Sequence, residues 1–534
     1  MKRDKTRSGL KKAARESADS GGVWDRNRKI FAVFFGSVLI FILVLKAYKA
    51  HYTGVIYDEA MTQRYFGGDI DKALHPTTIT NPNVPLTNNH VLNSIFIYYA
   101  HQIRGSYEHF IRIPSLAAGI IFSLALAYII CKTIRSYVLR TASLLLISLT
   151  PFVFDYSFLA RGYAFVLAAI FTQIALVLYL LDRKIKFQSW LIPALIISAL
   201  NFLAFGALFS SIIYLTAFNL TFILFCSPRI FRDPPPFWKP VILMGVSIFL
   251  VSLASVYLLY HGMYEDVISG EAFKEIGSRW RGWSSFLDLL YRLLAIKVFK
   301  VNNTGGAVNL GALVLLLAVS IGYYIYKLRS AVKQGFGRKY LWRDDPALLL
   351  FLVTSLSLIF MFVYGVILNK SIGLERNNVI LVPMVLISAV IILDRFASSL
   401  GKNYLTHIAR AVVATVIIAV ILHNPPSTRF ISGATISGPL LRKLKAVDPY
   451  KTWNIGFTKQ TRLYPMSFGY YQQFDYNFDA TGNIEQPDVT VCLLKEIPPN
   501  IFCLEKENFS KSGCAVILNP SFPFDRVVLD VKLR

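Results

Sequence analysis

Long apolar runs alternate with short polar connectors along most of the chain. Each run holds roughly 17 to 25 mostly hydrophobic residues, which is the length an α-helix needs to cross a hydrocarbon core of about 30 Å. The pattern predicts an all-α polytopic membrane protein with about eleven spans. These spans are expected at residues 30–48, 110–131, 141–157, 163–181, 189–206, 207–226, 239–260, 309–326, 346–368, 378–393 and 411–424.

Composition agrees with this class and excludes a soluble protein. The chain has 534 residues, of which 54% are hydrophobic and 16% are charged. A soluble chain of this length would divide into several domains with a much more polar surface. The apolar runs stop near residue 424, so residues 30–424 are expected to form one transmembrane domain.

The net charge of +25 raises the possibility of nucleic-acid binding, which the distribution of the charge argues against. A nucleic-acid binder would gather basic residues on one folded face, with aromatic residues between them. Here ten Lys and Arg residues lie in residues 1–29, a basic cytoplasmic tail, and others occupy short connectors such as 183–186. This is the positive-inside pattern of membrane proteins, and the same residues suit contact with anionic lipid head groups.

The same rule orients the chain, with the amino terminus in the cytoplasm and the carboxyl terminus outside. The first span lacks a small-residue cleavage pattern, so it is not expected to be a removed signal peptide. The segments predicted to lie outside are 49–109, 158–162, 261–308, 369–377 and the tail from residue 425.

The first external loop, 49–109, is too long for a plain connector. It begins with YDEAMTQRYF and later contains VLNSIFIYYAHQI, at about 91–103. This second segment is amphipathic and too short to span, so it is predicted to be a helix along the membrane surface.

Residues 425–534 are predicted to form an external α/β domain. The segments TWNIGFT, DVTVCLL, CAVILNP and RVVLDVKL are typical of strands, and Ser437 is placed to cap a short helix. Cys492, Cys503 and Cys514 would permit one disulfide in an oxidising compartment, but their spacing does not select the pair.

Ionisable residues gather at the predicted external ends of the spans, where they are costly unless paired or functional. Together they offer a carboxylate base and several cations on one side of the membrane. That combination suits chemistry on a lipid phosphate, because cations hold the anion while a carboxylate takes a proton from a hydroxyl. The residues are Asp58, Glu59, Asn88, Asn89, His90, Asp155, Arg161, Lys370, Glu375 and Arg376.

The motifs YDEAMTQRYF, PLTNNHVLNSIF, RIPSLAAGI and SFLARGYAF, in this order and spacing, resemble the GT-C membrane glycosyltransferases. More narrowly they resemble the bacterial branch related to protein O-mannosyltransferases and to the lipid A aminoarabinose transferase. The resemblance covers about residues 30–230 and, more loosely, Arg376. The family's mannosyltransferases often have His-Pro-Pro or Lys-Pro-Pro where this chain has NNHVLN, which leaves the sugar and the acceptor open.

The resemblance implies a sugar donor carried on a polyprenyl phosphate and an inverting transfer to an acceptor hydroxyl of a lipid, glycan or protein. The protein would be a multi-pass protein of the bacterial inner (plasma) membrane, with its active site facing the periplasm or the exterior. No cofactor is expected, and a divalent metal is possible without being indicated. The implied catalytic residues are Asp58, as general base, and Glu59; the implied substrate-binding residues are Asn89, His90, Arg161, Tyr163, Lys370 and Arg376.

Structural interpretations stand beside these assignments. Asp58 could cap the helix that follows it, and the arginines could be interfacial residues that reach toward water. Asp69 and Asp71 are spaced like a metal-binding Asp-x-Asp but are more typical of a turn. At the level of function, the alternatives are a transporter or flippase for a lipid-linked sugar and a membrane assembly protein.

Overall fold

The computed structural model describes the part of the chain that carries most of the predicted membrane domain. The described residues are 29–51, 55, 57–67, 69–74, 90–104, 108–182, 191–230, 245–246, 250, 254, 257–258, 282–293, 346–368, 375–399, 403–423, 453–457, 478–479, 489–491, 514–519 and 522–531. The predicted span 309–326 and most of 239–260 fall outside them, so the count of about eleven spans stays a prediction.

Within the described residues, six helices are long and apolar enough to cross a membrane: Lys29–His51, His109–Thr133, Tyr163–Leu180, Ala347–Ile367, Leu381–Ser399 and Tyr404–Leu422. Three shorter apolar helices accompany them, at Tyr137–Leu149, Ile192–Ala207 and Phe209–Ile223. The protein is therefore a mostly helical, multi-pass membrane protein.

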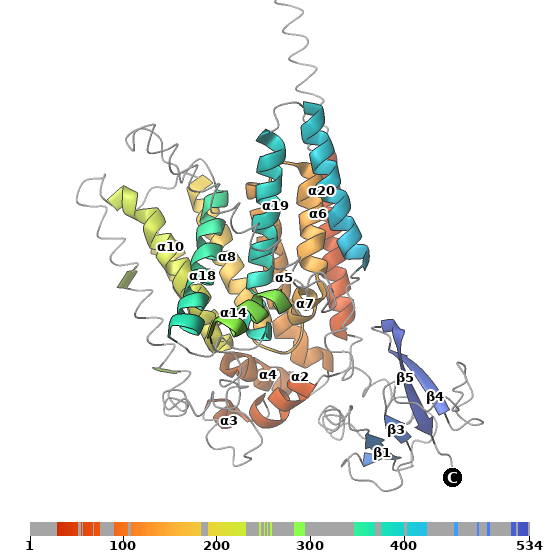
Figure 1. Ribbon diagram of the computed structural model, residues 1–534. Helices are drawn as coiled ribbons and strands as arrows, with labels where there is room; N and C mark the ends of the chain where they lie inside the picture. Colours follow the sequence, from red (N-terminus) through yellow and green to blue (C-terminus); the bar gives the residue numbers. More distant parts are fainter. Residues whose placement is uncertain are drawn as a thin grey trace, which may run out of the picture.

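The long helices pack side by side into a bundle (Figure 1). Helix α5 packs against α8, α6 against α20, and α10 against α18. The first helix and α20 contribute many exposed apolar side chains, which is what a lipid-facing surface requires. The bounds are α5 Glu108–Thr133, α6 Tyr137–Leu149, α8 Tyr163–Asp182, α9 Leu191–Ala207, α10 Ile212–Ile230, α18 Ala347–Phe362, α19 Leu381–Ser399 and α20 Asn403–His423.

Two predicted spans have different bounds in the structure. The span predicted at 141–157 is broken, because Thr150 leaves the helical region and Pro151, which has no N–H, starts a new short helix α7, Pro151–Tyr156. The span predicted from residue 411 begins two turns earlier, at Asn403, since Arg410 lies within the helix and not at its end.

Short helices lie across one end of the bundle, at the bottom of Figure 1. They are α2 Tyr57–Thr62, the π-helical turn Gln63–Gly67, α3 Ile70–Leu74, α4 Val91–Arg104, α7 and α14 Gly282–Tyr291. Helix α4 matches the helix predicted at 91–103. It packs against the π-helical turn Gln63–Gly67 and against α5. This layer positions the candidate site.

A close approach of backbone to backbone fixes the turn between α7 and α8. A Cβ atom on Gly162 would come within 1.8 Å of the Ala207 carbonyl oxygen and 3.0 Å of His90 Nδ1. A side chain at this position would therefore push apart the end of α9 and the start of α4, which is why a glycine is needed here.

The carboxyl-terminal part contains a five-stranded sheet with the order β2-β1-β3-β5-β4. β1 pairs in parallel with β2 and β3, and β5 pairs antiparallel with β3 and β4. Four of the strands were predicted and β2 was not, because two residues carry no alternating pattern. The helix expected after Ser437 lies outside the described residues. The strands are β1 Trp453–Phe457, β2 Phe478–Asp479, β3 Val489–Val491, β4 Cys514–Asn519 and β5 Phe522–Val531.

Candidate active site

A fully buried ion pair anchors the short helix α2 to the start of α5. Arg112 Nε donates to Glu59 Oε1 at 2.7 Å, and Arg112 Nη2 donates to Glu59 Oε2. Both side chains are completely buried. Arg112 Nη1 also donates to the Ala50 carbonyl oxygen at 3.0 Å, and the Ala160 N–H donates to Glu59 Oε1 at 2.7 Å. The ion pair of Glu59 and Arg112 thus joins the end of the first span, α5 and the turn before α8.

This arrangement separates the roles of the two acidic neighbours. Both carboxylate oxygens of Glu59 accept hydrogen bonds, from Arg112 and from the Ala160 N–H. Glu59 therefore supports the fold and is not available as a base. Asp58 precedes it on α2, in the first turn of the helix. The side chain of Asp58 lies outside the described part of the structure, so its assignment as general base stays a prediction.

The segment SFLARGY lies beside α2 and α4 and is held by both. Asn93 Nδ2, on α4, donates to the Ala160 carbonyl oxygen at 3.0 Å. Arg161 is 1% exposed, and its Nη1 donates to Thr62 Oγ1 at 2.6 Å. Ser115 Oγ, on α5, reaches the Arg161 carbonyl oxygen at 3.4 Å. The guanidinium of Arg161 is therefore fixed at the end of the bundle with its charge held away from water.

His90 lies next to this turn, at the start of α4, and its ring orientation is defined. Its Nδ1 is 2.9 Å from the Ala207 carbonyl oxygen. A carbonyl can only accept, so Nδ1 carries the proton. Burial lowers the pKa of His90 well below its ordinary value, and the charges of Arg161 and Arg376 lower it further, against a smaller opposing effect of the Ala207 hydrogen bond. The ring is therefore neutral at pH 7, and Nε2 is left as a hydrogen-bond acceptor.

The turn before α19 completes this group. It is a 3-10 helix, Glu375–Asn378, in which Arg376 is half-buried. Tyr163 Oη donates to Asn377 Oδ1 at 3.4 Å, and Tyr214 Oη donates to Asn378 Oδ1 at 2.8 Å. These bonds tie the turn to α8 and α10, while the Tyr163 ring meets the His90 ring edge-on at 5.1 Å.

Asp155, on α7, is a buried carboxylate that the fold does not satisfy. It is completely buried, and neither carboxylate oxygen has a hydrogen-bond partner among the described residues. Lys49, near the end of the first span, is the cation that acts on it electrostatically. A buried polar group without partners calls for an explanation, and substrate contact is one.

The interpretation of Asp69 and Asp71 as a metal pair is not supported. Asp69 Oδ1 accepts the Asp71 N–H at 3.0 Å, and the Asp69 carbonyl oxygen accepts the Ala73 N–H at 3.1 Å. Asp69 therefore caps α3. No group of three or more His, Cys, Asp or Glu side chains in the described part of the chain could hold a metal ion. The expectation that no metal is required stays a prediction.

The structure brings together five of the residues predicted from the sequence: Glu59, His90, Arg161, Tyr163 and Arg376. Asn89 and Lys370 lie outside the described residues. Sequence reasoning missed Arg112, Asn93 and Asn377, and it named Asp155 without giving it a role. For Asp155 a signal existed, since a lone Asp within the apolar run PFVFDYSF is hard to bury without a purpose. For Arg112, nothing in the sequence separated it from the other basic residues at span ends.

In chemical terms, the site combines a buried and a half-buried guanidinium group, a neutral imidazole and a buried carboxylate without a hydrogen-bond partner among the described residues. The cations favour an anion such as a phosphate, since arginine presents a planar fork of donors. The neutral His90 adds an acceptor for a hydroxyl and no further charge. The aromatic ring of Tyr163 closes one side.

No protein-family model matches the chain, and no curated protein does either. Several solved structures are similar. ArnT from Cupriavidus metallidurans in the apo state has 16% sequence identity and a TM-score of 0.41, covering 84% of this chain and 76% of that one. The same protein bound to undecaprenyl phosphate has 15% identity and a TM-score of 0.40, with the same coverage.

The oligosaccharyltransferase of Archaeoglobus fulgidus in the apo form has 12% identity and a TM-score of 0.40, covering 84% of this chain and 65% of that one. ArnT and this oligosaccharyltransferase are both members of the GT-C superfamily, which is the superfamily that the sequence motifs resemble. A likeness at this identity and TM-score concerns the course of the chain and carries no argument about the reaction.

Proposed function

We propose that the protein is an inverting glycosyltransferase that moves a hexosyl or pentosyl group from a polyprenyl-phosphate-linked donor to an acceptor hydroxyl at the external face of the membrane. The observation that carries the proposal is the cationic group around His90. Tyr163, which follows Arg161 and Gly162, meets the His90 ring at 5.1 Å and donates to Asn377, the neighbour of Arg376, at 3.4 Å. Two arginines from segments far apart in the sequence are thereby brought to the same end of the bundle.

The donor phosphate would bind between Arg161 and Arg376. In the reaction, the bond from the anomeric carbon to the phosphate oxygen breaks, and the electron pair stays with the phosphate. The two guanidinium groups stabilise the charge that grows there, so a second carboxylic acid to protonate the leaving group is unnecessary. His90, as a neutral acceptor at Nε2, would orient a donor hydroxyl without competing for the phosphate.

Asp58 would act as the base. Its carboxylate accepts the proton of the acceptor hydroxyl while the hydroxyl oxygen forms the new bond to the anomeric carbon, from the side opposite to the phosphate. The buried pair of Glu59 and Arg112 fixes α2 and thereby the position of Asp58. Asp155, whose carboxylate has no hydrogen-bond partner in the described part of the chain, would bind a polar group of the sugar or of the acceptor.

The location of the site also supports this proposal. The elements that carry the site, among them α2, α4 and α7, lie together at one end of the bundle of long helices (Figure 1). A donor with a polyprenyl chain could therefore leave its tail in the hydrocarbon and present its phosphate at this end. The external carboxyl-terminal domain remains without an assigned role.

The test uses purified protein in lipid nanodiscs with radiolabelled polyprenyl-phosphate sugars and a panel of glycan, lipid and peptide acceptors. We expect transfer by the wild type and a loss of about 10²- to 10⁴-fold in Asp58→Asn, the usual worth of a general base. Arg376→Gln should instead weaken donor binding. Arg292→Gln, which changes an exposed arginine of the pair with Asp288, is the matched control.

Two results would contradict the proposal. Near-wild-type transfer in Asp58→Asn would leave Asp58 as a helix cap. Absence of transfer and of donor hydrolysis, together with movement of the lipid-linked sugar across the bilayer, would favour the flippase alternative.

A further inference from the structure

A second cluster of basic residues lies at the opposite end of the bundle from the candidate site. Helix α5 carries Arg112 near its start and Lys132 near its end. Twenty residues of helix at 1.5 Å each separate them by about 30 Å, the thickness of a hydrocarbon core. The end of α5 and the turn to α6 therefore lie at the other membrane interface.

Three basic residues gather around this turn, at the end of α5 and the start of α6. Lys132 and Arg135 are exposed, and Arg140 is half-exposed. Lys132 Nζ lies over the Tyr128 ring, 5.6 Å from its centre. Arg140 Nε donates to the Ile134 carbonyl oxygen at 2.7 Å, which fixes the guanidinium over the turn.

Two aromatic rings, one from the first span and one from α6, hold Arg140 in place. Its guanidinium carbon lies 5.7 Å from the centre of the Phe31 ring and 5.1 Å from that of the Tyr137 ring. These two rings stack on each other with their centres 4.4 Å apart. An arginine set on two aromatic rings is pre-organised, so it loses little conformational freedom when it binds an anion.

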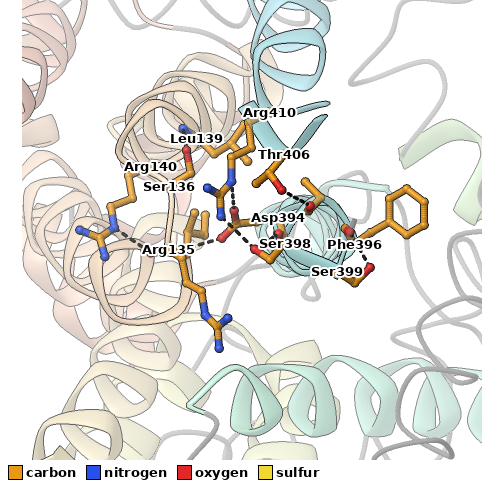
Figure 2. Close-up of polar contacts among 12 residues, drawn as sticks. Arg135, Ser136, Leu139, Arg140, Asp394, Phe396, Ser398, Ser399, Thr406 and Arg410 are labelled. Atoms are coloured by element: carbon orange, nitrogen blue, oxygen red, sulfur yellow. Dashed lines mark hydrogen bonds and ion pairs between the residues drawn. The ribbon is translucent and has the colours of Figure 1, made fainter. Parts of the chain in front are cut away.

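A carboxylate of the described residues that lies at this turn is already occupied. Asp394, on α19, accepts the Arg135 N–H at 2.7 Å through Oδ2 and Arg410 Nε at 2.9 Å through Oδ1. Figure 2 shows that Asp394 meets the backbone of Arg135, while the guanidinium of Arg135 and that of Arg140 point away from it. The positive charge of both side chains is therefore available to a ligand.

Exposed apolar side chains adjoin the cluster on the same elements. Phe34 lies one turn after Phe31 on the same side of the first span, Val138 follows Tyr137 in α6, and both are more than half exposed. A phosphate at the arginines would thus have hydrocarbon contact directly beside it. A ligand that carries both features is a membrane phospholipid.

We propose that Lys132, Arg135 and Arg140 form a binding site for the phosphate of an anionic glycerophospholipid, whose acyl chains lie along Phe34 and Val138. The site is separate from the proposed active site and does not depend on its function. It would hold one lipid in a defined position, beyond the general attraction of basic residues to an anionic leaflet.

The experiment measures binding of phosphatidylglycerol to the full-length protein in detergent, by native mass spectrometry, with phosphatidylcholine as the neutral comparison. A basic residue near an anionic lipid surface is worth about a fivefold change in affinity. We therefore expect Arg135→Gln to weaken phosphatidylglycerol binding about fivefold, and the double variant with Arg140→Gln about 25-fold. Phosphatidylcholine binding should not change.

Arg135→Gln suits the test because Asp394 contacts the backbone N–H of residue 135, which the substitution keeps. Arg292→Gln, at the other end of the bundle, removes the same charge and should leave binding unchanged. Equal weakening in Arg292→Gln would mean general attraction to charge and would overturn the proposal. Displacement of the lipid by millimolar inorganic phosphate would overturn it too, because the acyl contacts would then contribute nothing.

Discussion

Glu59 is completely buried, and a carboxylate in that position is tolerated because its partners are complete. Arg112 meets it through two N–H groups and the Ala160 N–H adds a third donor. Breaking a buried pair leaves an uncompensated charge, which costs more than the pair itself contributes. The residue scale therefore divides the acidic pair of the first loop into a supporting Glu59 and a proposed catalytic Asp58.

The first prediction concerns this pair. Glu59→Gln should lower the free energy of unfolding by about 3–5 kcal/mol, because Arg112 stays buried without a counter-charge. The measurement is the thermal unfolding midpoint in detergent. Asp288→Asn is the matched control, since the pair of Asp288 with Arg292 is nearly half exposed and such pairs contribute about 0–1 kcal/mol. Equal shifts in the two variants would contradict the structural role of Glu59.

The second prediction concerns pH. Burial and two arginines hold the pKa of His90 well below its ordinary value, so the folded protein disfavours the protonated ring. The unfolded chain binds the proton below about pH 6.5. Stability from this residue is therefore complete above that pH and falls as the pH drops toward the folded pKa. The unfolding midpoint of the wild type should fall more between pH 7.5 and 5.5 than that of His90→Gln, and parallel profiles would refute the idea.

At the scale of elements, the site depends on a turn that passes very close to a helix end. Gly162 lets the segment before α8 approach the Ala207 carbonyl oxygen, the same atom that orients His90. The turn is further tied to α4 by Asn93. Helix α4 is therefore placed by contacts with the start of α8 and the end of α9, in addition to its own amphipathic pattern.

The third prediction follows from that approach. Gly162→Ala should lower activity and the unfolding midpoint, because the added Cβ would meet the Ala207 oxygen at 1.8 Å and push it away from His90. Gly36→Ala is the control, because a Cβ there has no atom within 4 Å among the described residues. Both are measured in the transfer assay and by thermal unfolding. If the two variants behave alike, the close approach does not matter for the site.

On the scale of the whole molecule, two groups of polar contacts at opposite ends, each called a node below, connect the helices of the bundle. At the site end, Glu59 and Arg112 join the first span, α2, α5 and the turn before α8. At the other end, Asp394 joins α19 to α20 and to the connector between α5 and α6 (Figure 2). Between these nodes, apolar contacts between helices give little direction, because lipid is as apolar as the side chains.

The fourth prediction concerns the second node. Asp394→Ala removes the acceptor of both the Arg135 N–H and Arg410 Nε. Loss of an acceptor from buried, partly charged donors should cost about 1–3 kcal/mol in the free energy of unfolding. Asp394→Asn, which keeps one acceptor oxygen, should cost less. A ranking in the opposite order, measured by thermal unfolding, would show that the node does not bind the helices.

Much of the fold was predictable because the bilayer imposes it. An apolar run of about 20 residues has to form a helix in hydrocarbon, so the described spans and the surface helix α4 appear where the pattern predicts them. The break at Thr150 and the early start of α20 were not predicted. At Thr150 the following proline interrupts the helix within an apolar run. In α20 the pairing of Arg410 with Asp394 lets a charged residue lie inside the helix, so the helix begins before the apolar run does.

The candidate site was predictable in part. Motif resemblance indicated Asp58 as the base, together with Arg161 and Arg376, but the sequence could not show that Glu59 is held in a buried ion pair. It could not find Arg112 as a partner either, because these residues meet only after distant segments fold together. The lack of a hydrogen-bond donor to the Asp155 carboxylate among the described residues likewise depends on which segments pack around it.

The sequence by itself determined the class of this protein, the position of most described spans and the set of charged residues at their ends. Hydrophobicity is a local property, and whether a segment crosses a bilayer depends mainly on the length and hydrophobicity of that segment. The tertiary structure alone decided which charges are satisfied by one another, as in Glu59 with Arg112, and which stay available, as in Asp155. Pairing depends on distance in space, and residues separated by dozens of positions meet only when the helices pack.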